Sequence, residues 1–411
     1  MAKSEILTGL DIGSTKVTCV IAARDEEAGK VRILGGASAD CKGLKTGMAI
    51  NIEEVARAIG FAVEAAESRA GQVASEVLLG IRGPHLYSLE GHGRLNISRT
   101  DQEITAEDVA NVIDNGKAFS LDHGMEILHV VPQKFSLDRL QGVPNPIGMQ
   151  GALLEARTHM VLGSTPVISN LMKAVGAAGF KVTDNPIYSL LALGELAVSE
   201  EEKALGTLLV DIGAQTTSLA IYIDGAMHFS KELTIGGDSI TKDIAHGLGT
   251  TAGWARELKE KYGACYSSLV DKDKRIAVMK ADRCTQVEIV AKDLLPFIQP
   301  RLEEIFEMIF EAVQKSAYPD LPGGVILAGG GALLKGMPEA AKELLELPQA
   351  RLAYPVPELL ECPKEYAAQA YLGAVALTCY PYLKSWSTDL PDSRRRGGAL
   401  KNIWRQLADF F

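Results

Sequence analysis

The chain has 411 residues, of which 47% are apolar and 23% are charged. This length exceeds what one hydrophobic core usually organises, so we expect at least two lobes, and the composition is that of a soluble globular protein. The formal net charge of −10 at pH 7 argues against a nucleic-acid-binding protein, whose binding surface is typically basic.

The N-terminus leads directly into an apolar strand, and no apolar run is long enough to span a bilayer. We therefore expect a cytoplasmic protein whose contact with a membrane is peripheral. The cysteines are scattered without the paired spacing of metal sites, which favours buried thiols in a reducing compartment. They are Cys19, Cys41, Cys265, Cys284, Cys362 and Cys379.

A strand–loop–strand pattern opens the chain. Ile6–Leu10 predicts a strand that runs into Asp11-Ile12-Gly13-Ser14-Thr15-Lys16. Further strands are expected at Val17–Ala23 and near Val31–Gly35.

The same pattern recurs in the second half of the chain. A strand at Thr207–Val210 runs into Asp211-Ile212-Gly213-Ala214-Gln215-Thr216-Thr217. Leu219–Ile223 follows and turns back at Asp224-Gly225, a dipeptide typical of hairpins. Two copies predict two related α/β lobes with duplicated mixed sheets, each carrying its own loop.

Three helices are predicted with particular clarity. Asn51 is placed to cap a helix over Ile52–Ala70. Leu294–Lys315 has the apolar stripe of a long amphipathic helix, and the small apolar residues of Ala367–Leu377 predict a buried one.

The two Asp-Gly loops have the chemistry of a phosphate site. Glycine lets backbone N–H groups approach phosphate oxygens, while hydroxyl groups and a lysine add contacts. Asp11 and Asp211 would position Mg²⁺ through water, because Mg²⁺ gives up its water shell reluctantly. The expected ligand contacts in the loops are Asp11, Gly13, Ser14, Thr15, Lys16, Asp211, Gly213, Gln215, Thr216 and Thr217.

A glycine run forms a third part of this pattern. Strand Gly324–Ala328 leads into Gly329, Gly330 and Gly331, which suggests that something flat lies against the backbone. Three glycines alone are also compatible with a flexible turn. Together with the two Asp loops, they favour a nucleotide site.

The last residues predict an amphipathic helix at 399–411, after a polar linker at 386–398. One helical face gathers Leu400, Ile403, Trp404, Leu407, Phe410 and Phe411. Aromatic residues beside the basic cluster Arg394–Arg396 favour a helix that binds anionic membrane lipid, although a helix docked on its own protein has the same pattern. One such helix binds weakly, whereas a polymer presenting many would bind tightly.

In their order and spacing, the two loops and the glycine run resemble the actin/Hsp70/sugar-kinase superfamily. The resemblance implies a two-lobed ATPase fold that holds ATP and Mg²⁺ in its cleft, with the glycines beside the adenosine. It also implies that Lys259 contacts the ribose or base, while a solvated helix lysine is an equally simple interpretation.

Within this superfamily, the chain resembles the FtsA family of bacterial cell-division proteins. The stretches that carry the resemblance are Lys45–Met48, Gly91–Arg94, Ile127–Gln133 and Asn145–Met149. The resemblance implies an actin-like fold with an inserted subdomain. It divides the chain into subdomain 1A (1–84, 164–190 and 363–385), inserted subdomain 1C (85–163), subdomain 2A (191–235 and 301–362), subdomain 2B (236–300), the linker and the membrane-targeting helix.

The same resemblance implies a protein that polymerises into protofilaments and ties the tubulin-like division protein FtsZ to the inner face of the cytoplasmic membrane. The C-terminal tail of FtsZ would dock on subdomain 2B, where Arg301 is a hypothetical contact to its acidic peptide. Pairing of Arg301 with Glu303 or Glu304 is the alternative. Other division proteins are further expected partners.

Two departures from the superfamily concern the handling of ATP. Relatives usually have more glycine in the second loop, where this chain has Ala214 and Gln215, so we expect looser phosphate contact. Relatives also carry a glutamate that activates water where this chain has Asn185, and asparagine cannot take a proton. We expect tight binding and weak hydrolysis, with no catalytic residue assigned.

Two other functions remain open from the sequence. A sugar or acyl kinase of the same fold would need a catalytic aspartate and a shaped substrate pocket, and no clear motif marks either one. Another actin-like scaffold, such as a pilus-assembly ATP-binding protein, is disfavoured by the C-terminal helix and by the segment around His129.

Overall fold

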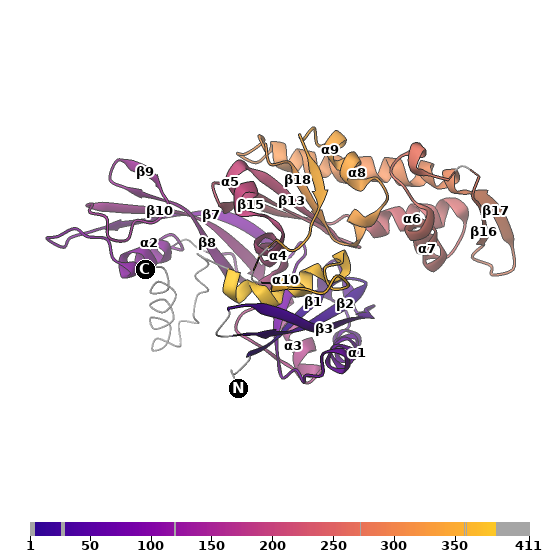
Figure 1. Ribbon diagram of the computed structural model, residues 1–411, viewed down its shortest axis with the longest axis horizontal. Coiled ribbons are helices and arrows are strands. Elements are labelled where there is room, and N and C mark those ends of the chain that lie inside the picture. The colour runs from indigo at the N-terminus through magenta and orange to yellow at the C-terminus, as the bar shows by residue number, and fades with distance from the viewer. Residues whose placement is uncertain are drawn as a thin grey trace.

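The fold is described from a computed structural model over residues 5–25, 29–118, 121–271, 273–356, 358 and 360–383. Figure 1 shows two α/β lobes stacked on each other, with a β-rich subdomain at one end of the molecule and a helical subdomain at the other. The predicted linker 386–398 and helix 399–411 lie outside the described residues.

The first lobe is built on a seven-stranded sheet. Its strands run in the order β11-β6-β1-β2-β3-β20, and β12 also pairs with β6. β1 and β2 form an antiparallel hairpin, while β6 lies parallel to β1 on its other side. The bounds are β1 Glu5–Ile12, β2 Lys16–Arg24, β3 Val31–Asp40, β6 Glu76–Ile81, β11 Lys181–Val182, β12 Ile187–Tyr188 and β20 Leu360–Glu361.

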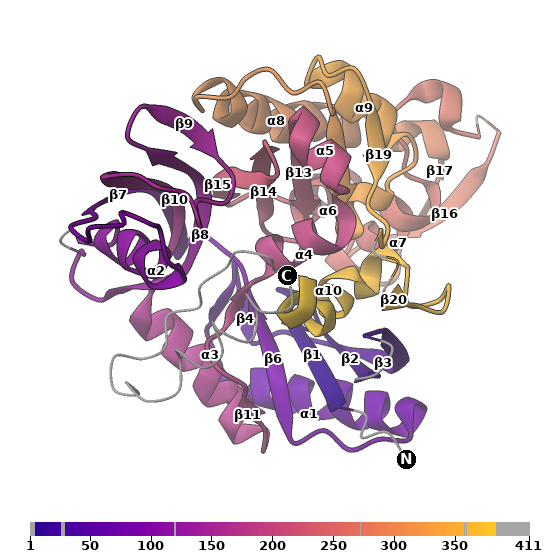
Figure 2. The ribbon, with the colours of Figure 1, turned by 60° about the vertical axis from the view of Figure 1, so that its left-hand side comes forward.

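Helices cover both faces of this sheet. α1 (Ile52–Ala70) and α3 (Thr165–Ala177) pack on the outer face, and α10 (Gln369–Leu383) lies between the two lobes (Figure 2). The predicted cap of α1 is confirmed, since the Asn51 side chain accepts a hydrogen bond from the Glu54 N–H at 3.2 Å. A short hairpin precedes α1 and consists of β4 Leu44–Lys45 and β5 Met48–Ala49.

The second lobe repeats the first. Its five-stranded sheet has the order β15-β14-β13-β18-β19, with β13 antiparallel to β14 and parallel to β18. Asp11 pairs with Thr18 across one hairpin and Asp211 with Ser218 across the other, so the registers match and the predicted duplication is confirmed. The bounds are β13 Thr207–Ile212, β14 Thr217–Ile223, β15 Ala226–Leu233, β18 Val325–Ala328 and β19 Ala350–Leu352.

Helices of the second lobe include the predicted long amphipathic one. The helix expected at Leu294–Lys315 is α8, whose buried stripe includes Leu302, Ile305 and Phe306. The glycine run forms a short 3₁₀ turn, η3, rather than entering the next α-helix directly. The bounds are α4 Ser189–Ala197, α5 Glu200–Leu205, α8 Leu295–Gln314, η3 Gly330–Leu333 and α9 Met337–Leu344.

Two subdomains project from the ends of the lobes (Figure 1). One is a four-stranded sheet, β7-β10-β8-β9, whose buried cluster includes Val130, Phe135 and Leu154. Its elements are β7 Leu86–Asn96, α2 Ala106–Asn115, β8 Met125–Leu137, β9 Leu140–Val143 and β10 Leu153–Ser164. The other contains α6 Gly237–Leu248, α7 Ala252–Tyr262, η1 Ser267–Leu269, β16 Arg275–Met279, β17 Gln286–Val290 and η2 Ala291–Leu294.

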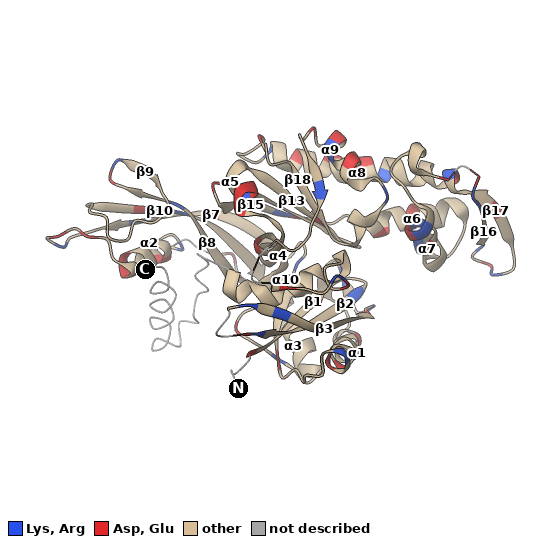
Figure 3. Cartoon of the chain, in the orientation of Figure 1, with Lys and Arg blue, Asp and Glu red and all other residues tan. Residues whose placement is uncertain are grey.

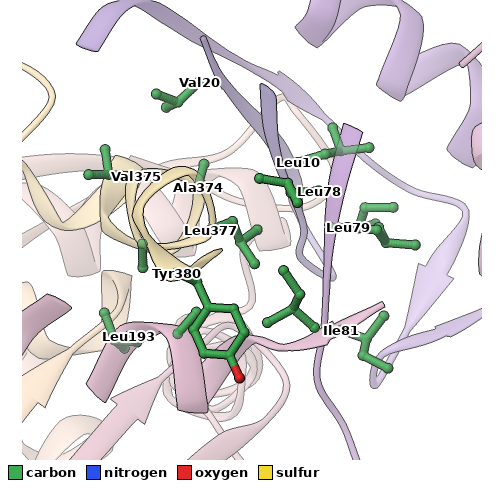
Figure 4. Close-up of a cluster of buried hydrophobic side chains, with 14 of the residues drawn as sticks. Leu10, Val20, Leu78, Leu79, Ile81, Leu193, Ala374, Val375, Leu377 and Tyr380 are labelled. Carbon is green, nitrogen blue, oxygen red and sulfur yellow. The ribbon is translucent and has the colours of Figure 1, made fainter. Parts of the chain in front are cut away.

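The helix predicted to be buried is the centre of the main core. Figure 4 shows Ala374, Val375, Leu377 and Tyr380 of α10 among side chains of the first sheet and of α4. The same buried cluster continues into the second sheet through Tyr222. Apolar packing around α10 therefore joins the lobes behind the cleft.

The predicted burial of the cysteines is confirmed for four of the six. Cys19, Cys41, Cys265 and Cys379 are buried, whereas Cys284 is exposed, and all six are free thiols. Figure 3, which colours the ribbon by residue type, shows acidic and basic residues interspersed along α6 and α7, with acidic residues prominent at α5 and α9. Within the described part of the chain, no helix has the length and apolarity needed to cross a membrane.

Candidate functional site

A cleft of about 810 Å³ lies where the two duplicated hairpins face each other. Both loops have the same internal bond, since the Gly13 N–H donates to the Lys16 carbonyl and the Gly213 N–H to the Thr216 carbonyl, each at 2.9 Å. The expected site residues that line the cleft are Asp11, Gly13, Ser14, Thr15, Lys16, Asp211, Gly213, Thr216, Lys259, Gly329, Gly330 and Gly331.

Arg82 joins the two loops across the cleft. Its Nη2 lies 2.6 Å from both carboxylate oxygens of Asp11, and its Nη1 lies 2.5 Å from Asp211 Oδ2. The side chains of Arg82, Asp11 and Asp211 are only 14%, 16% and 6% exposed. A mostly buried guanidinium thus bridges two carboxylates that belong to different lobes, and its single positive charge offsets one of their two negative charges.

Burial and charge act in opposite directions on these groups. Burial raises the pKa of Asp211, and the neighbouring Arg82 partly offsets this rise. Burial by itself would lower the pKa of Arg82, but Asp11 and Asp211 together raise it. Charge pairing across the bridge therefore opposes the effect of burial on the pKa of both Arg82 and Asp211.

The sequence interpretation missed Arg82, although a signal was present. A charged residue stands directly after the apolar strand β6, which lies parallel to β1. Ligands of α/β sheets bind outside the carboxyl ends of such strands, so a charge at this position is a candidate contact.

Glu232 of β15 forms a second buried polar centre behind Arg82. Its Oε1 accepts a hydrogen bond from the Tyr188 hydroxyl at 2.9 Å, and its Oε2 accepts from Ser218 Oγ at 2.8 Å and the Gly83 N–H at 3.1 Å. Burial raises the pKa of Glu232 to about 7. Since Gly83 follows Arg82 and precedes β7, these bonds fix the start of the inserted sheet to the second lobe.

Lys259 reaches the cleft from α7. Its Nζ donates to the Gly237 carbonyl at 2.8 Å, at the first turn of α6. Burial lowers the pKa of Lys259. This placement differs from that of a solvated helix lysine and puts a cation at the edge of the cleft.

The glycine run has a partly structural explanation. A Cβ on Gly329 would lie 2.3 Å from Asp211 Oδ1, and one on Gly331 would lie 2.4 Å from Ile212 Cγ2. These two glycines let the turn pack against the end of β13. A Cβ on Gly330 would meet nothing within 4 Å, so this is the position of the run that faces open space.

Gln215 and Thr217 were expected at the site but do not line the cleft. Thr217 is buried in β14, and its hydroxyl donates to the Ile235 carbonyl at 2.8 Å. Gln215 Oε1 accepts a hydrogen bond from the Thr46 N–H at 2.9 Å. Asn185 also lies elsewhere, exposed in the turn between β11 and β12.

Arg301 lies on α8 at the helical end of the molecule. Its Nε and Nη2 form a two-pronged contact with Asp243 of α6, at 2.7 and 3.1 Å, and its Nη1 pairs with Glu304. The alternative pairing of Arg301 with Glu304 is thus present, and Asp243 is an additional partner that sequence spacing did not indicate.

Sequence comparison identifies the family. A model described as "Cell division protein FtsA" matches residues 208–376, and one described as "SHS2 domain inserted in FTSA" matches residues 83–162. The cell division protein FtsA of Pseudomonas aeruginosa is 33% identical over 352 residues, which are 85% of this chain and 83% of the relative. That of Streptococcus pneumoniae is 34% identical over 344 residues, covering 84% and 74%.

This chain belongs to the FtsA family of cell-division proteins. Solved structures show in addition that it has the predicted actin-like fold. A PilM-PilN type IV pilus biogenesis complex has a TM-score of 0.63 at 16% identity, covering 91% of this chain and 98% of that one. MreB5 of Spiroplasma citri bound to ADP has a TM-score of 0.52 at 14% identity, covering 92% and 96%.

Proposed function

We propose that this FtsA-family protein binds ATP with Mg²⁺ in the cleft and uses the bound state to control assembly. The observation that carries the proposal is the pair of matched Asp-Gly loops that face each other there. Their N–H groups and hydroxyls, together with Lys16, suit a polyphosphate. Structures of MreB5 from Spiroplasma citri bound to ADP and to AMPPNP support an adenine nucleotide.

The residues at the floor of the cleft fit Mg²⁺. Asp11 and Asp211 provide carboxylate oxygens, and Asp211 Oδ1 is buried without a hydrogen-bond partner among the described residues. Mg²⁺ is usually held by one or two carboxylates, phosphate oxygens and retained waters. The ion would neutralise phosphate charge, while Arg82 keeps the carboxylates in place.

Hydrolysis should be weak. Asn185, which corresponds in sequence to the relatives' water-activating glutamate, is exposed outside the cleft and could not accept a proton from water. Binding would therefore act by stabilising a closed arrangement of the lobes, because a ligand that contacts both lobes favours closure.

We further propose that the protein polymerises and ties FtsZ to the inner face of the cytoplasmic membrane. Membership of the FtsA family favours this function over a small-molecule kinase or a pilus scaffold. The subdomain bounds given above and the lipid-binding face of 399–411 are parts of this proposal. Self-association and further division partners follow from the same family membership.

For the FtsZ tail, we propose the surface of α6 and α8 around Arg301. An acidic peptide would compete with Asp243 and Glu304 for the guanidinium. Arg301→Glu should abolish binding of a fluorescent FtsZ tail peptide, whereas Arg275→Glu, an exposed cation on β16, should leave it unchanged. Equal peptide affinity of Arg301→Glu and the wild type would remove Arg301 from the proposal.

Nucleotide binding itself is tested by titrating a fluorescent ATP analogue into the full chain with Mg²⁺. We expect saturable binding that Lys16→Glu weakens by at least tenfold. Lys30→Glu makes the same charge change at an exposed lysine outside the cleft and serves as the control. Absence of saturable binding by the wild-type protein would refute the nucleotide site.

A further inference from the structure

One hydrogen bond joins the two lobes beside the cleft, away from the carboxylates at its floor. Gln215, in the second Asp-Gly loop, accepts it from the backbone N–H of Thr46 at 2.9 Å, and the two residues are 169 positions apart. Thr46 lies in the β4–β5 hairpin of the first lobe. Gly47 and Ala214, the neighbours of these residues, both line the cleft, so the bond lies at its margin.

The first-lobe end of this bond is held rigidly. Thr46 and Gly47 both adopt left-handed conformations, with φ of 46° and 80°. That conformation is uncommon for a β-branched residue and persists only where the surroundings impose it. A Cβ on Gly47 would lie 2.2 Å from the Arg82 carbonyl oxygen, so the turn packs directly on the backbone beside the Arg82 bridge.

The second-lobe end is held as firmly. The Gly237 N–H donates to the Gly213 carbonyl at 2.9 Å, and the Asp238 N–H donates to the Ala214 carbonyl at 2.7 Å. Both donors belong to the first turn of α6, which therefore fixes the two loop residues directly before Gln215. Neither loop can follow the other when the lobes separate, so separation has to break the Gln215–Thr46 bond.

We propose that Gln215 is a latch that holds the lobes together at the margin of the cleft and slows the release of bound nucleotide. The inference rests on the proposed nucleotide site and explains why a glutamine stands in a loop where glycine would have sufficed for phosphate contact. Arg82 shares its carboxylate partners with Mg²⁺, whereas the latch bond joins protein to protein only. The strength of the Gln215–Thr46 bond therefore sets the rate of nucleotide release independently of the metal.

The test measures dissociation of a fluorescent ADP from the full chain by stopped flow, with excess unlabelled nucleotide and Mg²⁺. Gln215→Leu keeps the size of the side chain and removes the acceptor. A neutral hydrogen bond is worth a net of about 0.5–1.5 kcal/mol, which converts to a roughly 2- to 12-fold faster release. Gln215→Glu keeps an acceptor oxygen, so the Thr46 amide hydrogen should stay as protected from exchange with solvent as in the wild type.

Further variants and a second readout keep the test decisive. Gln215→Asn keeps the amide but is one carbon shorter, so it should behave like Gln215→Leu. Gln286→Leu makes the same replacement at an exposed position on β17 and should change nothing. Without nucleotide, the Thr46 amide hydrogen should exchange with solvent faster in Gln215→Leu than in the wild type.

The outcomes separate the latch from the nucleotide site. If the wild-type protein binds no nucleotide, the proposed function fails, and the latch as a brake on release fails with it. If nucleotide binds and Gln215→Leu releases it at the wild-type rate, the site stands and the latch is wrong. Unchanged exchange at Thr46 would show that the bond does not hold the cleft closed.

Discussion

Replacing Arg82 with methionine should destabilise the protein strongly in Mg²⁺-free buffer. Methionine retains most of the apolar stem but removes the charge that lies between Asp11 and Asp211. Removing one partner of a buried ion pair typically costs about 3–5 kcal/mol, because the remaining charge is left uncompensated. We expect a loss of this size in the free energy of unfolding, measured by urea denaturation followed by circular dichroism.

Two further variants separate the charge effect from lost packing. In Arg82→Met with Asp211→Asn, one of the stranded carboxylates is gone, so at least half of the lost stability should return. Arg275→Met breaks the exposed pair with Glu288, whose side chains are 75% and 59% exposed, and should cost less than about 1 kcal/mol. If Arg82→Met stays within about 1 kcal/mol of the wild type, the bridge does not have the role described.

Three further predictions concern stability and use the same urea assay. Phe306→Ala, in the buried stripe of α8, should lower the free energy of unfolding by about 3–5 kcal/mol. Phe61→Ala, at a side chain that is 58% exposed, should lower it by less than about 1 kcal/mol, and equal losses would contradict the assigned core. Asn51→Ala should cost about 1 kcal/mol through loss of the α1 cap, and no loss would mean that water replaces the cap. Burial lowers the pKa of His85 to about 4, below its unfolded value near 6.5, so its contribution to stability is intact above pH 6.5 and is lost as the pH falls toward 4. Between pH 7.5 and 5 this loss is about 2 kcal/mol, which His85→Leu should remove and His92→Leu, at an exposed histidine, should not.

Local patterns predicted the parts of the fold that local forces determine. The β14–β15 hairpin follows from turn chemistry and strand alternation, and Asp224 and Gly225 at its turn both adopt the left-handed conformations that a two-residue turn requires. The cap at Asn51 and the stripe of α8 are also local. The matching strand registers of the two lobes are also a local effect, because the same short sequence pattern occurs in both.

The centre of the site could not be predicted in the same way. Arg82 lies 129 positions from Asp211, and Gln215 lies 169 from Thr46, so tertiary packing alone brings these partners together. Packing also decides which way a loop side chain points. Thr217 was expected to face a phosphate, but in β14 it lies inside the lobe and satisfies the Ile235 carbonyl.

Glu232 illustrates the same limit for a buried charge. Its position in β15 looks like an ordinary alternating strand residue in the sequence. Only the packed structure shows that Tyr188, Ser218 and the Gly83 N–H converge on its carboxylate. Family resemblance supplied what single-sequence patterns could not, namely the identity of the fold.

The most direct test of an ATP-dependent membrane tether is co-sedimentation of the full chain with liposomes that contain anionic lipid, with and without ATP and Mg²⁺. A chain that ends at Ser393 lacks the basic cluster and the proposed lipid-binding face and serves as the comparison. We predict that the full chain pellets, that ATP with Mg²⁺ increases the pelleted fraction, and that the shortened chain stays in the supernatant. If both chains stay in the supernatant under every condition, the protein is not the proposed tether.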